Sequence, residues 1–205
     1  MKIMAIIGSP RRGGNTEFLV DRVVQGAASS TDVEVDTLFV AESNIMYCSG
    51  CLTCTFPPPG TKICPLPDDM PSILQRILAC ETFIFGTPNH MRTVSAPLLT
   101  FFSRLLPLME FVADRDNDGQ ITGGGFASRL SGRKAAIVIS QGDPGFSSAL
   151  VHEVLERNLI DLGIKRVGDV ISRGNMGPQD VREKKDDLEK AFQLGVNLVT
   201  MSGMR

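Results

Sequence analysis

Four of the five cysteines lie between residues 48 and 64, a density that calls for a chemical explanation. They follow the spacing C-x2-C-x2-C-x9-C, at Cys48, Cys51, Cys54 and Cys64. Thiolates spaced this way along a loop can converge on one inorganic centre, and iron–sulfur clusters take four cysteine ligands. The spacing leaves two alternatives open, a zinc ion or free, redox-active thiols. The fifth cysteine, Cys80, is expected to fill space in the core.

A second candidate site is the segment GSPRRGGNT (residues 8–16). Its glycines allow close approach of the backbone to a ligand, and the amides at the start of the helix that follows favour an anion. Short polar and basic side chains complete the set: Ser9, Arg11, Arg12, Asn15 and Thr16. The segment matches neither the nucleoside-triphosphate loop nor the G-x-G-x-x-G fingerprint. We therefore expect a phosphate monoester here, the alternative being a glycine-rich turn that caps a helix without a ligand.

A third candidate site is acidic. Asp114, Asp116 and Asp118 alternate before Gly119, as in the first half of an EF-hand calcium loop. The twelfth position is Gly125 where that loop needs a glutamate. The pattern thus allows either a calcium site or a solvated acidic turn.

The elements that must position these residues follow from the apolar pattern. Short β-branched runs predict strands at 2–8, 33–40, 82–86, 134–140 and 166–172, and helical spacing predicts helices at 15–28, 68–79, 93–106, 146–162 and 178–201. This alternation predicts a doubly wound, five-stranded parallel sheet with helices on both faces. We expect a single domain of residues 1–205, with a cysteine-rich loop at 45–66 and an irregular insertion at 107–132. Ligands of such sheets bind outside the carboxyl ends of the strands, here the loops after residues 7, 40, 86 and 140.

Three segments in these loops carry a family resemblance. GSPR-x-x-GNT, FGTPNHMRTVSAPLLTFFSR (residues 85–104) and SQGDPGF (residues 140–146) resemble the NADPH-dependent FMN reductase family, which has a flavodoxin-like fold. The resemblance covers residues 1–150 and implies FMN, with its phosphate in the first loop. It also implies contacts to the flavin ring from Thr87, Pro88, Asn89, His90, Met91, Gly142 and Asp143.

This chain departs from the family pattern at a few positions. His90 stands where the family usually has tyrosine, so it either stacks on the ring or is a loop residue bonded to backbone. Leu99 and Ser103 replace the usual lysine and aspartate, which leaves Arg104 without its customary partner.

The cysteine spacing resembles that of iron–sulfur flavoproteins, a subgroup of the same family. This resemblance implies a [4Fe–4S] cluster beside FMN and electron transfer between the two. The interval before Cys64 is longer than in that subgroup, and relatives without a cluster can keep similar cysteines.

These features predict a flavin-dependent oxidoreductase in which flavin N5 carries the chemistry and no side chain is catalytic. Its redox partner is expected to be a protein such as ferredoxin, or NAD(P)H, and the protein is expected to be a homodimer or homotetramer. The first functional hypothesis is an electron carrier that links the cluster to FMN. The second is an NAD(P)H-dependent reductase of flavins or quinones without a cluster, and the third is a scaffold that has lost its cofactor.

Charge and composition argue against several kinds of partner and location for the protein. The net charge is −2 and no long basic run is present, which argues against a nucleic-acid partner. The apolar start breaks at Gly8 and is too short for a membrane span or a signal-peptide core. We therefore expect a cytoplasmic protein without membrane association, in which disulfides are disfavoured.

Overall fold

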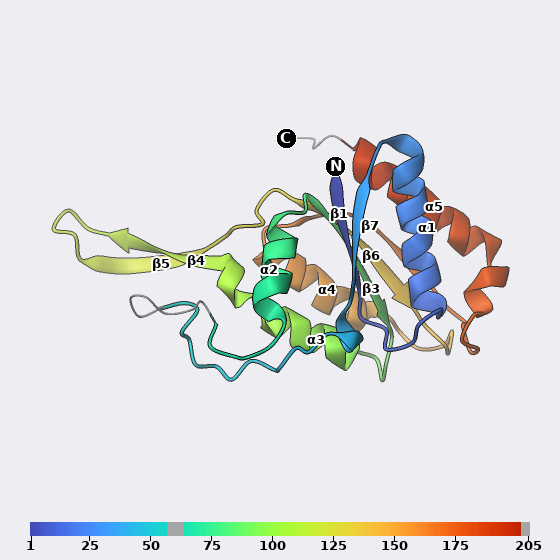
Figure 1. The fold of residues 1–205 in the computed structure, drawn as a ribbon, viewed down its shortest axis with the longest axis horizontal. Helices are drawn as coiled ribbons and strands as arrows, with labels where there is room; N and C mark the ends of the chain where they lie inside the picture. Colours follow the sequence, from blue (N-terminus) through green and yellow to red (C-terminus); the bar gives the residue numbers. More distant parts are fainter. Residues whose placement is uncertain (57–63, 202–205) are drawn as a thin grey trace.

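The computed structural model describes residues 1–56 and 64–201. Within these residues, five parallel strands form one sheet in the order β2-β1-β3-β6-β7 (Figure 1). The strands are β1 (Lys2–Ile7), β2 (Glu34–Phe39), β3 (Thr82–Pro88), β6 (Lys134–Ser140) and β7 (Lys165–Ser172). This order is that of the flavodoxin-like sheet, so the predicted fold class is confirmed.

Helices cover both faces of the sheet because side chains along each strand alternate between the faces. Ile3, Ala5 and Ile7 pack under α1 (Asn15–Ser30) and α5 (Lys185–Thr200), whereas Met4 and Ile6 face the opposite layer. That layer consists of α2 (Met70–Leu78), α3 (Ala96–Ser103) and α4 (Ala149–Asp161). The described residues also form three short 3-10 helices: η1 (Val40–Glu42), η2 (Leu106–Leu108) and η3 (Asp180–Glu183).

Several helix boundaries differ from the sequence prediction, and the later starts of two helices have a clear local reason. The helix expected over 93–106 begins only at Ala96, because residues 90–93 form a tight turn in which Met91 and Arg92 have φ of 49° and 64°. The helix expected over 178–201 begins at Lys185, because η3 and its flanking residues precede it.

The insertion at residues 107–132, predicted to be irregular, contains an antiparallel hairpin. Its strands are β4 (Met109–Arg115) and β5 (Ile121–Ser128), and the hairpin extends away from the sheet (Figure 1). Strand β5 was not predicted from the sequence because it contains three consecutive glycines, and glycine is depleted in strands. Gly124 has a packing role: a Cβ there would lie 2.6 Å from Cζ of Phe111, so glycine leaves room for that ring across the hairpin.

The residues that resembled a calcium loop form the turn of this hairpin. The Gly119 amide donates to the Asp116 carbonyl at 3.0 Å, and Gly119 has φ of 79°, as in hairpin loops that end in a left-handed glycine. Oδ1 of Asp116 accepts the amides of Asp118 and Gln120 at 3.0 and 2.8 Å. The hydrogen bonds of the Asp116 side chain and the positive φ of Gly119 in the hairpin turn thus explain the aspartate–glycine pattern.

Helices α1 and α5 cross with their backbones in close contact. A Cβ on Gly26 would lie 1.9 Å from the Phe192 carbonyl oxygen, and a Cβ on Gly195 would lie 1.9 Å from that of Val23. We predict that Gly26→Ala lowers the free energy of unfolding by about 1–3 kcal/mol, because overpacking outweighs the better helix propensity of alanine. Urea denaturation measures this change. Gly125→Ala is the control, since a Cβ there meets nothing within 4 Å; equal effects of the two variants would contradict the close crossing.

Candidate functional site

The loops after β1, β3, β6 and β7 surround a cavity of about 380 Å³. Eight of the residues predicted to bind the cofactor line it: Ser9, Arg11, Asn15, Thr16, Pro88, Asn89, His90 and Gly142. Four others do not line it: Arg12, Thr87, Met91 and Asp143. The loop after β7 was not among the expected positions, and it contributes Asn175.

One end of the cavity is the amino-terminus of α1. The first helical hydrogen bond runs from the Phe18 amide to the Gly14 carbonyl, so the amides before it have no helical acceptor. The hydroxyls of Thr16 and Ser140 lie 2.7 Å apart and join α1 to the end of β6. The Ser9 hydroxyl accepts the Arg11 amide at 3.2 Å and fixes the turn before the helix. This end of the cavity therefore offers amides, hydroxyls and the Arg11 guanidinium to an anion.

The two neighbouring arginines point to different places. Arg11 lines the cavity, whereas the Arg12 guanidinium lies 2.7 Å from a carboxylate oxygen of Glu42 and 3.3 Å from the centre of the Phe39 ring. Arg12 also lies 3.7 Å from Glu17. The side chain of Arg12 is thus held outside the cavity.

The Asn15 side chain is used within the protein. Its Nδ2 donates to the Gly177 carbonyl at 2.7 Å, and its Oδ1 accepts the Val181 amide at 3.0 Å. Asn15 therefore holds the segment before α5 against α1. Because both polar atoms of its side chain are used in this way, only its backbone amide is available to an anion.

The other end of the cavity is built around Gln141. Its Oε1 accepts Nδ2 of Asn89 at 2.8 Å, and its Nε2 donates to the carbonyls of Asp143 and Phe146 at 2.6 Å each. Oδ1 of Asp143 in turn accepts the Gly145 amide at 2.8 Å. Gln141 was not predicted from the sequence, yet it links the loops after β3 and β6.

The residues on either side of Asn89 have different roles. Thr87 is buried, and its hydroxyl accepts the Ser95 amide at 3.1 Å, which makes it a support for the loop. Met91 is 91% exposed at the tip of the turn. Arg92 lies over the Phe146 ring at 4.7 Å, so the loops after β3 and β6 meet beside the cavity.

Two hydrogen-bond acceptors in this cavity lack a donor. Of three buried side-chain polar atoms without a partner in the described part of the chain, two are Oδ1 of Asn89 and Oδ1 of Asn175. Both residues line the cavity, and the amide nitrogen of each is already bonded within the protein. Buried polar atoms are normally paired, so these two atoms indicate a ligand that carries hydrogen-bond donors as well as an anionic group.

All four clustered cysteines line a second, small cavity of about 30 Å³. The Gly50 amide donates to Sγ of Cys48 at 3.4 Å, and hydrogen bonds from Thr53 lower the pKa of the Cys51 thiol. Burial raises the pKa of the Cys54 thiol. The four cysteines therefore line one small cavity, and the sulfurs of Cys48 and Cys51 receive hydrogen bonds, as sulfurs of iron–sulfur centres do. However, no group of three or more His, Cys, Asp or Glu side chains among residues 1–56 and 64–201 is arranged to hold a metal ion.

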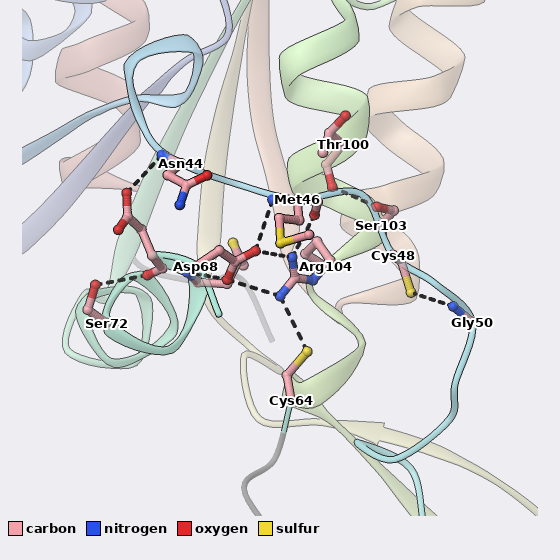
Figure 2. A network of polar contacts seen from close by, with 12 residues as sticks. Asn44, Met46, Cys48, Gly50, Cys64, Asp68, Ser72, Thr100, Ser103 and Arg104 are labelled. Carbon is pink, nitrogen blue, oxygen red and sulfur yellow. Dashed lines mark hydrogen bonds and ion pairs between the residues drawn. The ribbon is translucent and has the colours of Figure 1, made fainter. Parts of the chain in front are cut away.

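A buried ion pair lies beside this cavity (Figure 2). Arg104, at the end of α3, pairs with Asp68, so the prediction that Arg104 lacks a partner was wrong. Burial alone would raise the pKa of the Asp68 carboxyl, but hydrogen bonds from Arg104 and from two backbone amides hold it below its ordinary value. Arg104 also donates to Sγ of Cys64 at 3.3 Å.

The remaining candidates have simple structural roles. Cys80 is 1% exposed in the core, as predicted, and burial raises the pKa of its thiol to about 11. Within the described residues, nothing supports calcium at Asp114, Asp116 and Asp118, where the Asp116 side chain already caps the hairpin turn.

Comparisons of the sequence with known proteins point to one family. The family model described as NADPH-dependent FMN reductase matches residues 1–155. An iron-sulfur flavoprotein of Archaeoglobus fulgidus is 28% identical over 195 residues, which cover 95% of this chain and 77% of the relative. An iron-sulfur flavoprotein of Methanocaldococcus jannaschii is 32% identical over 137 residues, 67% of this chain and 68% of the relative.

A solved structure shares the fold at low identity. An FMN-dependent NADH-azoreductase of Bacillus anthracis, in complex with FMN, superimposes with a TM-score of 0.72 at 11% identity, covering 98% of this chain and 100% of that one. At this identity the likeness supports the fold alone. None of the helices in the described residues is long and apolar enough to cross a membrane.

Proposed function

Because the chain belongs to the NADPH-dependent FMN reductase family, we propose that its strand-end cavity holds FMN. The protein is a flavin-dependent oxidoreductase. The phosphate would bind the loop of residues 8–16 through Ser9, Arg11, Thr16 and the first amides of α1. The ring would lie towards Pro88, Asn89, His90 and Gly142.

The observation that carries this proposal is a pair of unpaired acceptors on residues that line the same cavity as the start of α1. FMN has a phosphate at one end and donors elsewhere, namely the ribityl hydroxyls and the ring imide. Oδ1 of Asn89 and Oδ1 of Asn175 lack the donors that such groups supply. The cavity thus offers complementary groups to both parts of the cofactor.

When bound, FMN would supply the redox chemistry, accepting electrons as hydride or one at a time. The protein's own residues would bind and orient it. Gln141 holds the two loops beside the cavity together through Asn89 and Phe146. We assign no side chain a catalytic role.

We further infer that Cys48, Cys51, Cys54 and Cys64 carry a [4Fe–4S] cluster that exchanges electrons with FMN. The position of all four cysteines around one small cavity supports this proposal, as does the Gly50 amide directed at Sγ of Cys48. The redox partner would then be a protein such as ferredoxin. The iron–sulfur flavoproteins among the relatives point the same way.

A second candidate function is an NAD(P)H-dependent reductase of flavins or quinones that has no cluster. It is favoured by the family description and by the absence of a metal-binding group in the described residues. The cysteines would then be free thiols.

One experiment separates the two. Protein purified without oxygen is assayed for FMN, iron and acid-labile sulfide, and its flavin absorbance is followed after NADH or NADPH is added. About four irons per chain, with slow bleaching by either nicotinamide, would support the cluster-bearing carrier. FMN without iron, with rapid bleaching, would support the reductase, and protein that binds no FMN would refute both.

We also infer a homodimer or homotetramer, with the β4–β5 hairpin as its contact. This hairpin exposes Phe111, Val112, Ile121 and Phe126, and an isolated two-stranded hairpin is marginally stable in water. We expect light scattering to give a mass of two or four chains, and Phe126→Lys to shift it towards one. Gln120→Lys, at the exposed turn, is the control; a monomeric wild type would contradict this inference.

A further inference from the structure

We infer that Asp68 and Arg104 act as a clamp that joins the two described ends of the cysteine segment, at Met46 and Cys64, and positions Cys64 beside the other three thiols. The two residues are positioning residues. The inference deepens the proposed function, but part of its test is independent of whether a cluster is present.

The first argument is burial. The side chains of Asp68 and Arg104 are 0% and 2% exposed, so neither charge is solvated by bulk water. A charge buried in this way is tolerated only when it is paired and hydrogen-bonded. Loss of either partner would leave the other as an uncompensated buried charge, and the surrounding segment would have to open to hydrate it.

The second argument is what the pair holds. Arg104 Nη1 donates to the Met46 carbonyl at 2.6 Å, and the Met46 amide donates to Oδ2 of Asp68 at 2.9 Å. Met46 lies at the entry to the cysteine loop, and Figure 2 shows it directly beside the ion pair. Both backbone polar groups of Met46 are therefore bound by the two charged side chains.

The exit of the loop is held by the same pair. Arg104 Nη2 donates to Sγ of Cys64 at 3.3 Å, and Oδ1 of Asp68 accepts the Met70 amide at 3.1 Å, where α2 begins. Entry and exit thus meet on one guanidinium–carboxylate unit (Figure 2). Arg104 is fixed in turn by its position at the end of α3.

The third argument is the chemistry of the contact to sulfur. A guanidinium has five N–H donors in a rigid fork, so Arg104 can bind Asp68, the Met46 carbonyl and Cys64 at once. A lysine ammonium cannot reproduce that geometry. The placement of Cys64 towards the other thiols therefore depends on the arginine itself as well as on its charge.

Asp69 offers a matched control for Asp68. It is the adjacent carboxylate, and its Oδ2 accepts the Asn44 amide at 2.8 Å in an exposed position. It forms no ion pair in the described part of the chain. Replacing Asp69 removes the same charge from the same turn without touching the clamp.

The test compares Asp68→Asn and Arg104→Lys with Asp69→Asn in the FMN-bound full chain. The rate at which iodoacetamide labels each cysteine is mapped by mass spectrometry, and iron per chain is counted in the same samples. Cys80 is the internal reference, because it lies in the core away from the clamp. We expect Asp68→Asn to raise the labelling rates of Cys54 and Cys64 about tenfold or more, since a broken buried pair opens the segment. Asp69→Asn should stay within about twofold, since it removes only exposed contacts.

In iron-bearing protein, Asp68→Asn should also reduce iron from about four to less than one per chain while FMN is retained. Labelling rates and iron content equal to those of Asp69→Asn would overturn the clamp. If Asp68→Asn fails to fold, Arg104→Lys decides, because it keeps a cation at the site; unchanged labelling in that variant would overturn the inference. If the wild type holds no iron, the cluster proposal fails while the labelling rates still test the clamp.

Discussion

Replacing Ser9 with aspartate is expected to weaken FMN binding by about 100-fold or more, because it places a carboxylate where the phosphate would bind. Ser9 is buried in the loop between β1 and α1 and lines the cavity. Two like charges about 4 Å apart repel by roughly 4 kcal/mol at the effective dielectric of a partly buried site. The carboxylate would also compete for the same amides and for Arg11. Titration of the apoprotein with FMN, followed by quenching of flavin fluorescence, measures the loss.

Ser9→Asn is the control for that variant. Asparagine has the size of aspartate and can accept the Arg11 amide as the serine hydroxyl now does at 3.2 Å, so the turn should persist. We expect it to weaken binding about tenfold or less, the usual cost of one altered hydrogen bond between neutral groups. If both variants lose FMN equally, crowding rather than charge is responsible. If neither does, the phosphate binds elsewhere.

The position of the loop of residues 8–16 at the cavity could be predicted because its information is local. The glycines, the short polar side chains and the start of the helix lie within nine consecutive residues, GSPRRGGNT. The alternation of strands and helices is local too, and the fold class followed from it. The family resemblance added the residues after β3, of which Pro88, Asn89 and His90 line the cavity.

The features that could not be predicted depend on contacts between distant residues. Asn175 reaches the cavity from the loop after β7, outside the segments that carried the resemblance. Asp68 and Arg104 are 36 positions apart in sequence. Nothing in the spacing of either residue indicates the other, although Asp68 lies close to the start of α2 and its Oδ1 accepts the Met70 amide.

The hairpin was missed for a different reason. Residues 114–119 satisfy two patterns at once, since alternating aspartates before a glycine suit both a calcium loop and a hairpin turn. Local sequence cannot choose between them. The pairing of β4 with β5 decides in favour of the turn, as does the contact between the rings of Phe111 and Phe126, whose centres lie 5.6 Å apart.

Arg11 and Arg12 are adjacent in sequence, but only Arg11 lines the cavity, whereas Arg12 contacts Glu42. We predict that Arg11→Gln lowers FMN affinity about tenfold to 100-fold, the range expected for a lost hydrogen bond between charged groups. Arg12→Gln should lower it by about threefold or less, because an exposed charge outside the cavity is largely screened at ordinary ionic strength. Equilibrium titration of each apoprotein with FMN at two salt concentrations measures both effects.

The salt dependence makes the comparison decisive. The deficit of Arg11→Gln should persist at high salt, since Arg11 would contact the phosphate directly, whereas that of Arg12→Gln should vanish. Arg12→Gln has its own expected signature: a small loss of stability, about 0.5–1 kcal/mol, as the contacts to Glu42 and the Phe39 ring disappear. Equal losses of affinity would mean that Arg12 leaves Glu42 to reach the phosphate. A loss only in Arg12→Gln would reverse the assignment and place the anion on the β2 side of the loop.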